Sequence, residues 1–141
     1  MNADRLDNDR EAICDVLVAY ATAIDSRDWA LLRRVFTHDV HAHYGDLGEW
    51  HGVDDFAEFM DAAHQGFGTT HHRLTNFVVT IDGDRATART YVHAVLTLRD
   101  DPAAWYDALG HYDDVIVRSA DGWRIAERRF TTSRMLSGRS D

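Results

Sequence analysis

Tyr20–Trp29, with the sequence YATAIDSRDW, is the stretch around which the chain is organised. Apolar residues recur before it at spacings of three and four, which predicts a helix over residues 8–25. A second, shorter helix is predicted over residues 29–36, with Asp25, Ser26 and Asp28 as candidate N-caps. Asp25 therefore has two interpretations. It caps the second helix, or it is an acid kept for chemistry at a helix C-terminus, where its charge costs roughly 0.3–1 kcal/mol.

The period of the apolar residues changes along the chain, from helical to strand-like. A third helix is predicted over residues 53–64, after a short strand at 40–44, a turn at 46–48 and a partner strand at 49–51. Alternating patterns then predict four long strands, at 73–81, 85–99, 105–119 and 123–132. Residues 1–7 and 135–141 are interpreted as flexible tails of a single domain, 1–141, whose core is about 8–132.

Helices followed by a meander of strands predict an α+β fold. We expect a cone-shaped, curved antiparallel sheet packed against three N-terminal helices and enclosing a pocket, which is a natural ligand site.

Composition excludes several functions. The chain has 141 residues, 45% of them hydrophobic, and a net charge of −9, so neither nucleic acid nor an anionic membrane is an expected partner. All 15 basic side chains counted as Lys or Arg are arginine, which excludes a Schiff-base lysine. One cysteine, Cys14, allows no intramolecular disulfide. With no secretory signal and no apolar run of about 18 residues, a cytoplasmic protein is expected.

A second informative stretch is Thr69–Asn76, TTHHRLTN, where His71 and His72 are adjacent. Successive side chains on a strand point to opposite faces, so only one of the two faces the pocket. A histidine has an unperturbed pKa of about 6.5 and accepts a proton near neutral pH, and a carboxylate on its other nitrogen fixes the tautomer. The sequence contains no zinc-ligand motif, Gly-rich phosphate loop or dinucleotide fingerprint, so neither a metal nor a cofactor is expected.

The ordered motifs resemble the SnoaL-like family of the nuclear transport factor 2-like superfamily over residues 8–132. The residues that carry the resemblance are Tyr20, Asp25, Asp28, Trp29, Leu32, Phe36, Asp39, Val40, Gly52, Asp54, Asp55, His72, Asn76, Asp82, Gly83, Asp84, Ala86, Gly110, Tyr112, Asp114 and Asp121 to Ile125.

The superfamily includes scytalone dehydratase, hexachlorocyclohexane dehydrochlorinase, ketosteroid isomerase, polyketide cyclases and non-catalytic subunits. In its dehydratase and dehydrochlorinase branch, an aspartate and a histidine form a dyad, and Asp25 and His72 match these positions. His71 competes with His72, because a register error of one residue would exchange them. Further pocket residues expected from the pattern and the resemblance are Tyr20, Tyr44, His71, His93, Tyr112 and Arg129, with His111 as the competitor of Tyr112.

The resemblance implies a cofactor-independent lyase or isomerase, of dehydratase or cyclase type, acting on a small apolar cyclic molecule such as a polyketide, steroid or aromatic compound. In this hypothesis His72 removes a proton from carbon and Asp25 orients His72. The alternative is a non-catalytic binding module, or a structural subunit like the small subunit of ring-hydroxylating dioxygenases. The apolar alternation of the long strands, together with the habit of the family, predicts a homodimer or homotrimer.

Overall fold

The first helix, α1 (Ala3–Ser26), is longer than predicted. The computed structural model describes residues 2–141, and α1 begins at their edge, with the Asn2 side chain accepting a hydrogen bond from the backbone N–H of Asp4 at 3.2 Å. Most of the expected tail over residues 1–7 is therefore helical. The helix ends because Arg27 is left-handed, with φ of 58°, and its N–H caps carbonyls of the last turn. Asp25 thus lies in the last turn of α1.

Two shorter helices follow. In α2 (Trp29–Val35) the cap is Asp28, whose Oδ1 accepts the N–H of Leu31 at 2.9 Å. The capping interpretation of Asp25 is therefore wrong, because a residue three positions later does that work. Helix α3 (Val53–His64) has the predicted bounds and follows Gly52, whose φ is 97°.

Six strands form one open, curved sheet in the order β2-β1-β6-β5-β4-β3. Their bounds are Phe36–His43 for β1, Glu49–His51 for β2, Phe67–Asp82 for β3, Arg85–Leu98 for β4, Ala104–Ser119 for β5 and Gly122–Arg139 for β6, with a 3-10 turn at Gly45–Leu47. The sheet is mixed, not wholly antiparallel as predicted, because β1 runs parallel to β6. The expected tail at 135–141 is mostly strand, since β6 pairs with β5 as far as Arg139.

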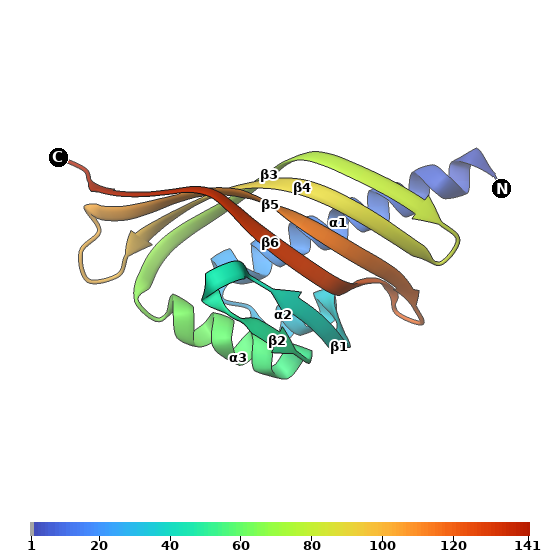
Figure 1. Ribbon diagram of the computed structural model, residues 1–141, viewed down its shortest axis with the longest axis horizontal. Coiled ribbons are helices and arrows are strands. Elements are labelled where there is room, and N and C mark those ends of the chain that lie inside the picture. Colours follow the sequence, from blue (N-terminus) through green and yellow to red (C-terminus); the bar gives the residue numbers. More distant parts are fainter. Residues whose placement is uncertain (1) are drawn as a thin grey trace.

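The helices lie on one face of the sheet (Figure 1). The α1 helix runs beneath the four long strands. Helices α2 and α3 and the short β1–β2 end of the sheet lie below the middle of these long strands. Apolar side chains from all these elements form one buried core, including Ile13, Leu17, Ile24, Leu32, Phe36, Val40, Phe56, Ile116 and Ile125. No helix within residues 2–141 has the length and apolar character needed to cross a membrane.

Two irregularities in the long strands decide which side chains face the helices. At Asn76, φ is 55° and the pairing of β3 with β4 slips, so the inward residues change from His72 and Leu74 to Val79. At Gly110 the pairing of β5 with β6 slips, and an added Cβ would lie 2.2 Å from the backbone oxygen of Thr131. Both irregularities lie on strands that carry cavity residues.

Candidate active site

A cavity of about 340 Å³ lies between the inner face of the sheet and helices α1 and α3. Its wall is mostly apolar, with a few polar side chains, which is the usual composition of a small-molecule site. The lining residues are Tyr20, Tyr44, Leu47, Phe59, Met60, Ala63, His64, Phe67, His72, Val92, Ala94, Leu96, Tyr106, Ala108, Tyr112, Phe130 and Met135.

Asp25 and His72 meet at the wall of this cavity. Asp25 Oδ1 accepts a hydrogen bond from Nδ1 of the His72 ring at 2.7 Å. Asp25 Oδ2 accepts a second one from the His72 backbone N–H at 2.9 Å. The His72 side chain is only 10% exposed. A carboxylate oxygen can only accept, so Nδ1 carries a proton, and in the neutral ring the lone pair is on Nε2. The histidine is therefore held in the tautomer that a general base needs.

The charge of Asp25 is stabilised although the side chain is half-buried. Burial by itself raises the pKa of Asp25, but hydrogen bonds from the His72 ring, the His72 backbone and the Thr70 hydroxyl outweigh it, so the pKa lies below its ordinary value. These donors also offset the unfavourable position of an acid at the end of α1. Asp25 is consequently an anion at neutral pH.

Two residues that the sequence analysis missed support the aspartate. Thr70 donates to Asp25 Oδ1 at 2.9 Å and is 2% exposed. Arg27 in turn donates to Thr70 Oγ1 at 2.9 Å and to the carbonyl of Gly68 at 2.7 Å. Thr70 could have been predicted from the sequence, because it precedes His72 by two residues and so shares its strand face. The contacts of Arg27 join segments that sequence patterns do not relate.

A second histidine, His64, also lines the cavity and was not predicted. Its Nδ1 donates to the carbonyl of Met60 at 2.8 Å, which leaves Nε2 as an acceptor. Burial lowers the pKa of His64, so its ring is neutral at pH 7. Its ring centroid lies 6.2 Å from that of His72. The signal was present in the sequence, where a polar residue ends the apolar stripe of α3.

Three buried tyrosines, Tyr20, Tyr44 and Tyr112, supply the phenols of the cavity. The hydroxyls of Tyr20 and Tyr44 are 2.8 Å apart, and the Tyr20 and Tyr112 rings meet edge to face at 5.6 Å. Burial raises the pKa of each, so all three remain protonated at neutral pH. The Tyr20 hydroxyl interacts with those of both Tyr44 and Tyr112, so the three phenols form one buried hydrogen-bonded group at the wall of the cavity.

A buried ion pair holds the tyrosines in place. Arg128 donates to both oxygens of Asp114 at 2.7 and 2.9 Å, and both side chains are 0% exposed. The guanidinium carbon lies 4.2 Å from the centre of the Tyr20 ring and 3.9 Å from that of Tyr112. Guanidinium groups stack favourably on aromatic faces. Arg129, the neighbour of Arg128, was predicted to line the pocket, because strand alternation alone does not say which of two adjacent arginines is buried.

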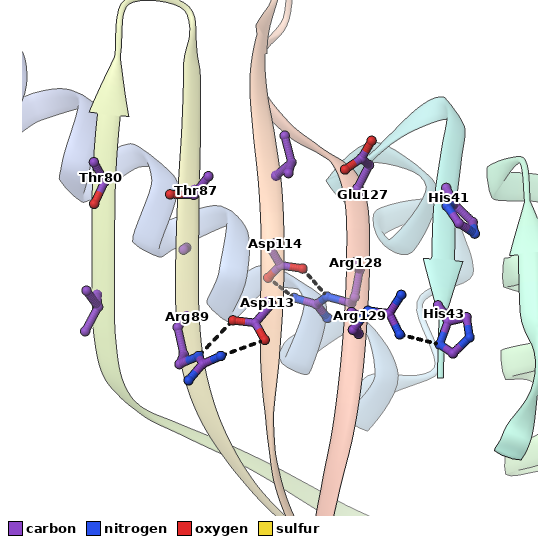
Figure 2. A pocket seen from close by; sticks show the side chains of 13 residues that line it. His41, His43, Thr80, Thr87, Arg89, Asp113, Asp114, Glu127, Arg128 and Arg129 are labelled. Carbon is purple, nitrogen blue, oxygen red and sulfur yellow. Dashed lines mark hydrogen bonds and ion pairs between the residues drawn. The ribbon is translucent and has the colours of Figure 1, made fainter. Parts of the chain in front are cut away.

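Three predicted pocket residues lie outside the cavity. His71 is exposed, whereas His93 and Arg129 are on the outer face of the sheet. There His93 Nε2 is 2.9 Å from Asp107. Arg129 contacts His43 at 3.3 Å, as Figure 2 shows. The expectation that they line the pocket is wrong, because each occupies the alternate face of its strand.

Figure 2 shows a second hollow, of about 470 Å³, on this outer face. Its prominent charges are already paired with each other, as in the bidentate contact of Arg89 with Asp113 at 2.8 and 3.0 Å. The inner cavity is the better candidate, since its polar atoms His72 Nε2 and His64 Nε2 have no such partner.

The model of the SnoaL-like domain family matches residues 7–129. The chain belongs to the SnoaL-like family. The uncharacterized protein Rv2910c of Mycobacterium tuberculosis (strain ATCC 25618 / H37Rv) is 35% identical over 125 residues, which are 86% of this chain and 83% of the relative.

Solved structures share the fold of this SnoaL-like chain. The Kfla4162 protein of Kribbella flavida is 31% identical with a TM-score of 0.87, over 93% of this chain and 95% of that one. A type 2 hexachlorocyclohexane dehydrochlorinase, LinA, superposes with a TM-score of 0.86 over 98% of this chain and 93% of that one. Its identity of 16% shows a shared fold alone.

Proposed function

We propose that this SnoaL-like protein is a cofactor-independent lyase or isomerase that moves a proton from carbon on a small apolar cyclic molecule. The observation that carries the proposal is the 2.7 Å hydrogen bond from His72 Nδ1 to Asp25 at the wall of the apolar cavity. It combines an oriented base, a fixed anion and an enclosed site, which are the requirements of general base catalysis.

His72 is the base in this reaction. Its Nε2 takes a proton from a carbon that a neighbouring carbonyl makes acidic, and Asp25 stabilises the imidazolium that results. The carboxylate accepts hydrogen bonds through both oxygens, so it does not need to reorganise when the charge forms. Most of the surroundings are apolar, which strengthens this electrostatic stabilisation.

The enolate that forms on the substrate needs a hydrogen-bond donor for its oxygen, and it must then either lose a leaving group or take up a proton. In this proposal a phenol of the buried tyrosine group donates a hydrogen bond to the enolate oxygen, since Tyr20, Tyr44 and Tyr112 all line the cavity and all keep their protons at neutral pH. Cleavage of the bond to a β-hydroxyl then completes an elimination, with the proton on His72 Nε2 passed to the leaving oxygen so that water departs. Return of that proton to another carbon instead completes an isomerisation. His64 Nε2 accepts a hydrogen bond from a substrate hydroxyl and so orients it.

The shape and composition of the cavity define the substrate class. A volume of about 340 Å³ lined by aromatic and aliphatic side chains suits a compact ring system of low polarity. Within residues 2–141, the side chains that line the cavity include no arginine or lysine for a carboxylate or phosphate, and the buried Arg128 directs two of its nitrogens at Asp114. Polyketide-derived, steroidal and simple aromatic rings bearing a ketone and a hydroxyl all meet these conditions.

The test is turnover of a panel of cyclic hydroxyketones, with loss of water or double-bond movement followed by mass spectrometry and NMR. His72→Ala should lower turnover by about 10²–10⁴-fold, because a general base contributes that much. His71→Ala is the matched control, an exposed histidine one residue away, and should leave turnover unchanged. A folded His72→Ala variant with full turnover would contradict the proposal.

The second candidate function is a non-catalytic module that binds the same ligands, favoured by the apolar wall of the cavity. Ligands that raise the melting temperature of the wild type but give no product with any member of the panel would support it. In that case His72→Ala should change affinity only modestly, since the base would have no transition state to act on.

A further inference from the structure

A compact group of three metal-type ligands lies outside the cavity, on the two short strands at the edge of the sheet. His41 on β1 and His51 on β2 are directly opposite each other in the antiparallel pairing. Glu49 lies two residues before His51, hence on the same face of β2. Each of the three offers one nitrogen or carboxylate oxygen as a ligand atom, and these atoms all lie within 4.8 Å of one another. Within residues 2–141, this is the one such group of histidine, cysteine or carboxylate side chains.

The donor atoms of the group converge on one point. The Nε2 atoms of His41 and His51 both approach the same oxygen, Oε1 of Glu49, the first in a short hydrogen bond and the second at 3.7 Å. The two imidazole rings are stacked, with centroids 4.4 Å apart and planes 9° from parallel. Because a carboxylate oxygen only accepts, His41 Nε2 carries the proton of this hydrogen bond, and a metal ion that displaced the proton would gain a nitrogen ligand from each ring and an oxygen ligand from Glu49.

We propose that His41, Glu49 and His51 bind a divalent transition metal of the zinc type. Two imidazoles and one carboxylate are a ligand set that zinc accepts, with a fourth position left for water. Donor atoms about 2.0–2.1 Å from a tetrahedral zinc are about 3.3 Å from one another, a spacing within reach of three side chains whose ligand atoms lie within 4.8 Å. To share an ion, the two stacked rings must tilt toward each other by side-chain rotation, because each nitrogen–metal bond lies in the plane of its ring. The rotations are unobstructed, because the His41, Glu49 and His51 side chains are 41%, 47% and 75% exposed.

The chemistry of the ligands also predicts selectivity. Imidazole nitrogens favour zinc, nickel and copper, whereas magnesium prefers oxygen ligands in octahedral geometry. A bound metal would join β1 to the edge strand β2, which leads through Gly52 directly into α3. We expect it to stabilise this edge of the sheet. The site is separate from the cavity, and the proposal does not depend on the proposed function.

The experiment is isothermal titration calorimetry of the purified chain with Zn²⁺, with Mg²⁺ as the comparison ion. We expect one Zn²⁺ site per chain that Mg²⁺ neither fills nor competes for. His41→Ala and His51→Ala should each weaken binding at least about tenfold, since changes to groups that merely support a metal ligand already cost about 10–100-fold. His38→Ala is the matched control, an exposed histidine on β1 outside the group, and should bind like the wild type.

A second readout follows the fold. Zn²⁺ should raise the melting temperature of the wild type and of His38→Ala but not of His51→Ala. Absence of Zn²⁺ binding, or equal binding to the wild type and to both ligand variants, would overturn the assignment and leave a hydrogen-bonded surface cluster. Glu49→Gln should weaken binding while preserving side-chain shape, and unchanged binding in this variant would remove the carboxylate from the site.

Discussion

At the scale of single residues, the candidate site depends on where buried charge is tolerated. Asp25 is kept ionised by three donors, and His64 is kept neutral by burial. Arg128 is charged but paired with Asp114 inside the core. Each group therefore has a separate role in the proposed proton transfer. Asp25 is the fixed anion beside His72, and His64 is a neutral histidine nearby.

The lowered pKa of His64 makes folding depend on pH in a definite window. Above about pH 6.5 the ring is neutral in both the folded and the unfolded chain, and its contribution to stability is complete. As the pH falls below that value, the unfolded chain takes up a proton that the folded chain resists, so stability is lost. His64→Gln removes this term, and its free energy of unfolding should fall less than that of the wild type between pH 7 and pH 5.

Urea unfolding of both proteins at several pH values measures the difference. The other eight histidines are common to both proteins, so subtracting the two profiles isolates His64. Parallel profiles over this range would show that burial does not depress the His64 pKa.

At the scale of elements, β5 carries a cavity residue past a close backbone approach. Gly110 lies two residues before Tyr112, and an added Cβ would meet the Thr131 oxygen of β6 at 2.2 Å. Gly110→Ala should therefore destabilise the chain by about 1–3 kcal/mol, since this backbone cannot yield without disturbing the sheet. Gly66→Ala is the matched control, because nothing lies within 4 Å of its added Cβ, and it should change stability by less than about 0.5 kcal/mol.

Chemical denaturation of the two glycine variants makes the comparison. Equal stability of Gly110→Ala and the wild type would mean that the strands part easily there, and that Gly110 does not constrain the position of Tyr112.

Element types were predictable, whereas element ends and strand partners were less so. Helix α3 has the predicted bounds because a strong apolar stripe stops at a glycine-containing turn. The prediction of flexible tails was wrong. Residues 3–7 belong to α1, which Asn2 caps, and residues 135–139 pair with β5, and neither kind of stabilisation produces an apolar pattern in the sequence. The parallel pairing of β1 with β6 is a tertiary choice that local sequence does not express.

The candidate site divides in the same way. Asp25, His72, Tyr20, Tyr44 and Tyr112 share the region of the cavity expected for them. His93 and Arg129 were misplaced although alternation is regular around them, because Val92 and Arg128 are the buried neighbours and the next residue of each strand faces outward. Met135, which lines the cavity from β6, was missed because its segment was interpreted as a tail.

At the scale of the whole molecule, the outer face of the sheet exposes apolar side chains. Val78 is 62% exposed, Tyr91 50% and Leu109 38%, on three neighbouring strands. We expect this face to bind a second copy of the chain, since large exposed apolar patches mark interaction surfaces. Light scattering at micromolar concentration should give a mass that is a multiple of 16.0 kDa.

Tyr91→Asp should shift this mass toward the monomer, by placing an unpaired charge in the interface. Val18→Asp is its control, because Val18 is 46% exposed but lies on α1, which covers the opposite face. A wild-type mass of 16.0 kDa at micromolar concentration would contradict the expected association.

The central claim is that His72, oriented by Asp25, removes a proton from carbon inside the cavity. The most direct measurement is exchange of carbon-bound hydrogen in D₂O, followed by NMR, for a cyclic ketone that binds the protein and has no leaving group. We expect the wild type to accelerate exchange at the carbon beside the carbonyl, His71→Ala to match it, and His72→Ala and Asp25→Asn to lose most of the acceleration. Equal acceleration by folded His72→Ala, or none by the wild type with the ligand bound, would contradict the claim.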